Sequence, residues 1–84
     1  MVKTLRSPQH KALIAELRRV RHHVGLTQVE LAERLGVAQS FVAKVEAAER
    51  RLEVVEFVRW LEATDALGDA ALVLDRVRLA QTDS

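Results

Sequence analysis

Amide, hydroxyl and ammonium side chains follow a glycine in the middle of the chain, at a spacing that suits one face of a short helix. Gln39, Ser40, Ala43 and Lys44 come after Gly36, within residues 39–47. In a major groove, glutamine pairs with adenine, lysine donates to guanine O6 and N7, and a methyl group contacts thymine. Ser40 suits either a base or a phosphate, and helix capping and solvation are the alternative role for Gln39 and Ser40. We expect these four residues to contact bases from the N-terminal part of that helix.

The residues before this helix predict a second helix and a tight corner. Thr27 and Glu30 have the spacing of a capping box, and Leu26 and Leu31 have that of a hydrophobic staple. A helix should therefore run from Gln28 to Leu35, and Gly36 supplies the left-handed residue that ends it. Two short helices joined by such a corner form a helix-turn-helix.

These segments resemble the phage-repressor helix-turn-helix family, also called the Cro/CI or XRE family. The resemblance spans about residues 13–67 and implies an all-α, compact five-helix lambda-repressor-like DNA-binding domain. The matching residues are Arg21, Gly25-Leu26-Thr27-Gln28, Glu30-Leu31-Ala32, Leu35-Gly36-Val37, Gln39-Ser40, Val42, Lys44, Glu46 and Arg50-Arg51-Leu52.

The resemblance also implies roles outside the base-reading face. Gln28 would clamp the DNA backbone and brace the first recognition residue, and its place at a helix start suits a phosphate. Arg50 and Arg51 lie where relatives contact phosphate, although two arginines in an exposed loop need no such role. Arg21 and Glu46 would form a partly buried ion pair that orients the recognition helix.

One segment departs from the family pattern. After Glu46, relatives commonly carry Asn or Asp and then Gly, whereas this chain has Ala47-Ala48-Glu49. Without a glycine for a left-handed cap, the recognition helix should run longer or end with strain. Ala43 is a second departure, because relatives usually have a polar residue at this place.

The remaining helices follow from capping signals and helical periodicity. Ser7-Pro8 marks the start of a helix over 8–23, a helix is expected over 53–66 with Val54, Phe57, Val58 and Leu61 inward, and Asp69 should cap a last helix that ends near Ala80. We divide the chain into a flexible arm (1–6), a helix-turn-helix domain (7–67), a C-terminal helix (68–80) and a loose tail (81–84).

The last predicted helix has more apolar surface than one core contact needs. Leu72 and Leu79 lie nearly opposite the stripe that Val73 and Val77 belong to. A surface helix normally has one apolar stripe. We expect a homodimer interface here with Trp60 at its edge, and the alternative is a small core that wraps around the helix.

Composition narrows the function classes. Residues 1–51 hold ten Lys/Arg and five Asp/Glu, a net +5, while residues 52–84 hold three and seven, a net −4. The basic half would face a polyanion, unless the difference is ordinary surface variation. The chain has no cysteine, and adjacent His22 and His23 diverge on a helix. We expect no metal, no cofactor and no catalytic residues, and hence no enzyme.

The sequence therefore predicts a sequence-specific regulator of transcription that binds double-stranded DNA, and repression is the commonest outcome in the family. The alternative is an antitoxin-type or other protein-interaction module whose last helix holds a toxin. Steep salt dependence of binding would favour DNA. With no signal peptide and no long apolar run, we expect a cytoplasmic, non-membrane protein, nucleoid-associated in bacteria or encoded by a phage.

Overall fold

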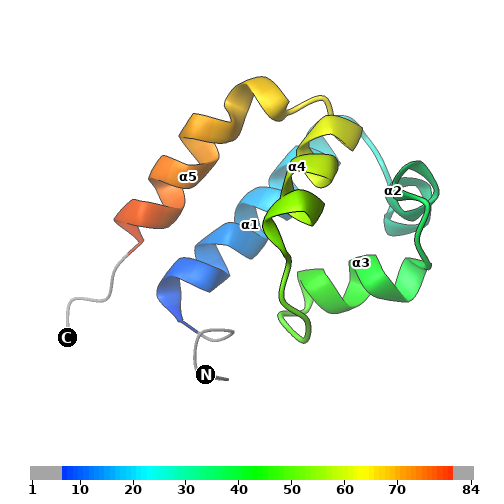
Figure 1. The fold of residues 1–84 in the computed structure, drawn as a ribbon, viewed down its shortest axis with the longest axis horizontal. Coiled ribbons are helices and arrows are strands. Elements are labelled where there is room, and N and C mark those ends of the chain that lie inside the picture. Colours follow the sequence, from blue (N-terminus) through cyan, green and yellow to red (C-terminus); the bar gives the residue numbers. More distant parts are fainter. Residues whose placement is uncertain (1–6, 81–84) are drawn as a thin grey trace.

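The computed structural model describes residues 7–80, which form five α-helices and no strand, as the predicted fold class requires. The expected arm (1–6) and tail (81–84) lie outside the described residues. Figure 1 shows the five helices in order: α1 (Pro8–His23), α2 (Gln28–Leu35), α3 (Gln39–Glu46), α4 (Val54–Ala63) and, after a 3₁₀ turn η2 (Leu67–Asp69), α5 (Ala70–Leu79).

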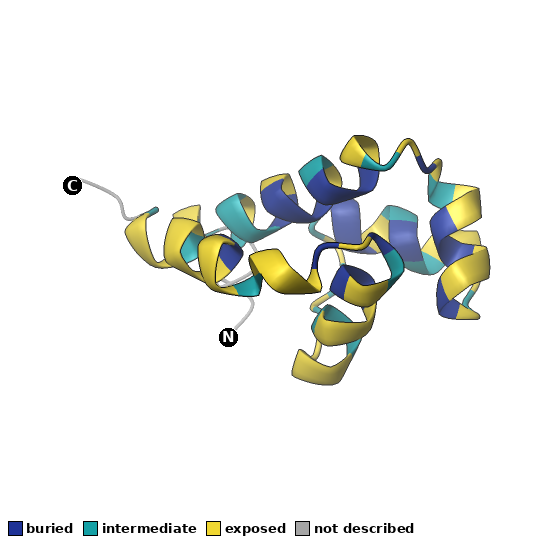
Figure 2. Cartoon of the chain, turned by 90° about the horizontal axis from the view of Figure 1, so that it is seen from above, coloured by how far each residue is buried: buried dark blue, intermediate teal, exposed yellow. Residues whose placement is uncertain are grey.

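The helices divide the molecule into two ends. α5 runs alongside α1 in the opposite direction, α2 and α3 form the other end, and α4 lies between them (Figure 1). Inward faces of α1 to α4 build the core, whereas α5 contributes one fully buried residue, Val73, and is mostly exposed (Figure 2). The buried apolar side chains are Ile14, Leu17, Val20, Leu26, Leu31, Ala32, Leu35, Val42, Val45, Trp60, Leu61, Ala66 and Val73.

Two of the predicted helix starts are confirmed in atomic detail. The Ser7 hydroxyl accepts a hydrogen bond from the His10 backbone N–H at 3.0 Å. The Thr27 hydroxyl accepts from the Glu30 N–H at 3.0 Å, and the Glu30 carboxylate accepts from the Thr27 N–H at 2.9 Å. This reciprocal pair satisfies two backbone donors that a helix start leaves without partners, and so fixes where α2 begins.

The ends of α1 to α4 share one geometry, in which a residue with positive φ reverses the chain. The residues are Gly25 (φ 75°), Gly36 (71°), Ala48 (60°) and Asp65 (55°). In each case the next residue donates its N–H to a carbonyl five positions back, for example Val37 to Ala32 at 3.0 Å and Glu49 to Lys44 at 2.8 Å. This is the Schellman motif, for which glycine is the usual residue.

The helix ends differ in detail from the expected ones. α3 ends at Glu46, one residue before the expected end, and the strained alternative holds, because Ala48 takes the left-handed conformation. α4 covers only Val54–Ala63, because Asp65 reverses the chain before Ala66. Asp69 occupies the N-cap position of α5, as expected, but its side chain makes no capping hydrogen bond.

The inward face of α4 is rotated from the predicted one. Trp60 and Leu61 are buried and Phe57 packs against the core, but Val54 is 78% exposed and Val58 lies at the surface. The expectation that Trp60 borders a dimer interface is therefore wrong. Its side chain has no exposed area, and its indole N–H donates to the Leu17 carbonyl at 3.2 Å.

None of the helices within residues 7–80 is both long enough and apolar enough to cross a membrane.

Candidate nucleic-acid interface

α3 presents a polar face to solvent and an apolar face to the core. Val42 and Val45 are fully buried, whereas Gln39, Ser40 and Lys44 are exposed. Ala43 is half-buried on the outer side. The N-cap of α3 is Ala38, which makes no side-chain capping bond, so neither Gln39 nor Ser40 acts as that N-cap. The four expected base-reading residues are thus brought together on one short helix whose N-terminal end is open.

A buried ion pair fixes α3 against α1, as the family resemblance implied. Arg21 Nε donates to Glu46 Oε2 at 2.7 Å, and Arg21 Nη2 donates to Glu46 Oε1 at 2.8 Å. Both residues are less than a tenth exposed. Arg21 Nη1 also donates to the Leu26 carbonyl at 2.8 Å, which ties the same guanidinium to the residue before α2. Two parallel hydrogen bonds fix the relative orientation of these groups, because a planar guanidinium and a planar carboxylate fit each other in only one way when both bonds form.

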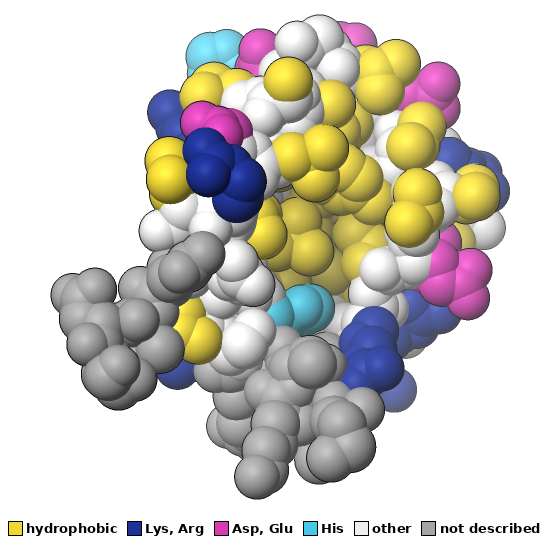
Figure 3. All heavy atoms as spheres, turned by 60° about the vertical axis from the view of Figure 1, so that its left-hand side comes forward, with side chains coloured by type: hydrophobic (Ala, Val, Ile, Leu, Met, Phe, Trp, Pro, Cys, Tyr) yellow, Lys and Arg dark blue, Asp and Glu magenta, His cyan; other side chains and the backbone are white. Residues whose placement is uncertain are grey.

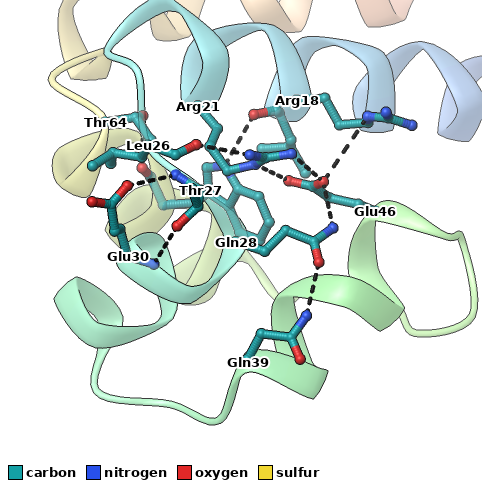
Figure 4. Close-up of polar contacts among 11 residues, drawn as sticks. Arg18, Arg21, Leu26, Thr27, Gln28, Glu30, Gln39, Glu46 and Thr64 are labelled. Carbon is teal, nitrogen blue, oxygen red and sulfur yellow. Dashed lines mark hydrogen bonds and ion pairs between the residues drawn. The ribbon is translucent and has the colours of Figure 1, made fainter.

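The ion pair continues into a chain of amides that reaches the first residue of α3 (Figure 4). Gln28 Nε2 donates to Glu46 Oε1 at 3.0 Å, and Gln39 Nε2 donates to Gln28 Oε1 at 2.8 Å. Gln28 therefore braces Gln39, and its own amide is largely used within the protein. The orientation of Gln39 depends on Glu46, 7 residues later in α3, through Gln28 of another helix.

The start of α2 carries a negative side chain beside its free N–H groups. The backbone N–H and the hydroxyl of Thr27 hold the pKa of Glu30 below its usual value. An ionised carboxylate here is favourable for the helix dipole. The same negative charge would repel a phosphate on the Glu30 side of this helix start.

Arg50 and Arg51 differ although they are adjacent. Arg50 donates to both carboxylate oxygens of Glu56, at 3.0 and 3.2 Å, and its guanidinium lies 4.4 Å from the Phe41 ring centre. The hydrogen bond from Arg50, and then the Glu53 backbone N–H, lower the pKa of Glu56. Arg51 is exposed. Arg50 thus secures the loop after α3, and Arg51 presents more of its surface to solvent.

Arg18, which no motif of the sequence marks, lies near this network. Its Nε is 4.0 Å from Glu46 Oε1, and Figure 4 shows it beside the Glu46 carboxylate. The available signal was its position three residues before Arg21 on α1, which places both arginines on one helix face.

Within residues 7–80, titratable groups away from α3 form no metal site. Across residues 7–80, no three His, Asp or Glu side chains gather closely enough to hold an ion. Burial, and then the charge of Arg51, lower the pKa of His10. Burial alone would raise the pKa of Glu16, but hydrogen bonds from Arg19 and Arg76 outweigh this and the net pKa is lowered.

Comparison with known proteins gives the same assignment as the geometry. Residues 12–73 match the family model described as a helix-turn-helix domain. The solved structure of an XRE-family like protein from Pseudomonas syringae pv. tomato str. DC3000 is 41% identical, covers 90% of each chain and superposes with a TM-score of 0.78. No curated protein is significantly similar to the chain. The chain therefore belongs to the XRE-type helix-turn-helix family, which at the family level makes it a DNA-binding regulator.

Proposed function

We propose that the protein is a sequence-specific regulator that inserts α3 into the major groove of double-stranded DNA and acts as a repressor by covering a promoter. The observation that carries the proposal is the outer face of α3, where Gln39 and Ser40 at the N-terminal end and Lys44 in the last turn are all exposed. Base edges in the major groove are reached by such residues near a helix start.

Gln39 is the strongest candidate for base recognition. One of its amide hydrogens is given to Gln28, which fixes the plane of the amide. The carbonyl and the second N–H remain, and together they form the acceptor and donor pair that matches adenine. Lys44 would donate to guanine one turn further along, Ser40 would bind a base or phosphate, and Ala43 would contact a thymine methyl.

Phosphate contacts would set the register of the protein on the duplex without carrying base information. Gln28 and Arg51 are the candidates near either end of α3. Arg50 contributes less directly, because Glu56 and Phe41 already hold its guanidinium.

We also propose that the protein binds as a homodimer through the face built by α5 and the start of α4. Leu72 and Leu79 are 45% and 63% exposed on one side of α5, and on its other side apolar side chains surround a hollow of about 180 Å³. Figure 3 shows hydrophobic side chains gathered around this hollow, whose lining residues are Leu13, Leu52, Val54, Phe57, Leu74 and Val77. A dimer would place two copies of α3 on half-sites roughly 34 Å apart.

Selection of binding sites from random duplexes tests the main proposal. The purified protein should enrich a palindromic consensus in which an adenine position loses its preference in the Gln39→Ala variant. Each lost base contact should reduce discrimination by roughly 1–3 kcal/mol. Enrichment of no sequence would overturn sequence-specific recognition.

Light scattering tests the dimer separately. Leu79→Glu should convert the protein to monomer, because it places a charge in the apolar interface. Val29→Glu, at a 53% exposed position on α2, should leave the mass unchanged. A wild-type protein that is monomeric at micromolar concentration would refute the dimer and favour an antitoxin-type partner for the same face.

A further inference from the structure

Arg18 lies near the hydrogen-bonded chain of Arg21, Glu46, Gln28 and Gln39 but donates no hydrogen bond to it. Its side chain is 54% exposed, and its nearest charged partner is Glu46 at 4.0 Å. Among the described residues it makes no hydrogen bond through its side chain. The Glu46 carboxylate attracts the Arg18 guanidinium, but 4.0 Å is too long for a hydrogen bond. The N–H donors of Arg18 therefore stay available.

Other arginines of the described chain are engaged differently. Seven of them give side-chain hydrogen bonds to a carboxylate or a backbone carbonyl: Arg19 to Glu16, Arg21 to Glu46, Arg34 to Ala63, Arg50 to Glu56, Arg59 to Leu35, Arg76 to Glu16 and Arg78 to Asp75. Arg19 gives a direct contrast, because it is adjacent to Arg18 and has its Nη2 2.9 Å from Glu16 Oε1.

The position of Arg18 connects it to the recognition helix. Glu46 Oε1, which it approaches, also accepts from Arg21 and from Gln28, and Gln28 accepts from Gln39. Figure 4 shows Arg18, Gln28 and Gln39 arranged around one edge of the α1–α3 contact. Arg21 already balances the charge of Glu46, so Arg18 adds a net positive charge next to Gln28.

We propose that Arg18 binds a DNA phosphate beside the groove that α3 enters, an inference that rests on the proposed function. A guanidinium can donate two parallel hydrogen bonds to phosphate oxygens. The nearby Glu46 carboxylate orients the Arg18 guanidinium but takes none of its hydrogen bonds. Because Arg18 lies on α1 and not on the base-reading face, its contact would strengthen binding to all sequences equally.

Salt titration of DNA binding tests this proposal. Wild type, Arg18→Ala and the matched Arg19→Ala variant are each titrated against the selected duplex and a random-sequence duplex. Loss of one phosphate contact lowers the slope of log affinity against log salt by about 0.9 for each bound protomer, which corresponds to about eightfold weaker binding per protomer near 0.1 M salt if the contact adds nothing at 1 M. Arg18→Ala should show this loss on both duplexes, whereas Arg19→Ala should retain the wild-type slope.

The controls separate a phosphate contact from a structural effect. Arg18→Lys should restore most of the slope, and thermal melting should show that Arg18→Ala folds as wild type does. Equal salt slopes for Arg18→Ala and Arg19→Ala would overturn the inference alone. So would a loss confined to the selected duplex, which would mean that Arg18 acts through Glu46 and Gln28 on base reading. A wild-type protein that binds neither duplex would overturn the proposed function together with this inference.

Discussion

The body of α3 and the loop that follows it are each held by an arginine–glutamate ion pair and by a turn with positive φ, but the two pairs differ in burial and the two turns differ in residue type. The body is fixed by Arg21 and Glu46, which are buried, and its preceding corner turns on Gly36. The loop is fixed by Arg50 and Glu56, which are partly exposed, and it turns on Ala48. An arginine–glutamate pair should therefore contribute more to stability when it is buried than when it is partly exposed. The same left-handed turn should cost less free energy at a glycine than at an alanine.

The largest expected difference lies between the two ion pairs. Glu46→Ala leaves the buried guanidinium of Arg21 without its partner, and should lower the free energy of unfolding by about 3–5 kcal/mol. Arg50→Ala removes a more exposed pair and a stacking contact, and should cost about 1 kcal/mol or less. Urea denaturation of both variants measures the difference. Equal unfolding free energies would show that burial does not distinguish the pairs.

The next effect lies between the two corners. Gly36→Ala places a Cβ at φ 71°, where an L-residue is strained by about 1–2 kcal/mol, partly offset by lower entropy of the unfolded chain. No heavy atom would meet that Cβ within 4 Å, so the conformation alone sets the cost. We expect a net loss of about 1 kcal/mol in thermal or urea unfolding.

Ala48→Gly is the converse change at the end of α3. Relief of the left-handed strain should stabilise the protein by about 0.5 kcal/mol, less than Gly36→Ala costs, because the Ala48 methyl group also packs against the core. The same unfolding measurement applies. A destabilised Ala48→Gly would show that methyl packing outweighs the strain of the turn.

The smallest effect is the acid sensitivity of the loop. Because the folded-state pKa of Glu56 is lowered, its contribution to stability is present above the unfolded pKa near 4.5 and is lost as the pH falls through the folded value. Glu56→Gln should therefore reduce the dependence of unfolding free energy on pH below about 4.5. Glu62→Gln, at an exposed position of the same helix, is the control and should follow wild type. Identical profiles for wild type and Glu56→Gln would contradict the prediction.

Helix starts and the first two corners were predictable from local chemistry. Thr27 with Glu30, and Ser7 before Pro8, carry capping signals that depend on residues at most three apart. Gly25 and Gly36 mark reversals because glycine adopts positive φ without steric cost. Ala48 and Asp65 adopt the same conformation without that signal, and the end of α4 was accordingly misplaced by three residues.

The sequence by itself determined an all-α chain, a helix-turn-helix and the residue types on the outer face of α3, because these depend on spacing along a single helix. Only the tertiary structure decided that Trp60 is core, that the Gln28 amide also bonds Glu46, and that Arg50 is hydrogen-bonded while Arg18 keeps its donors. Such partnerships join residues from different helices, and whether a charge is used or available depends on the packing that brings those helices together.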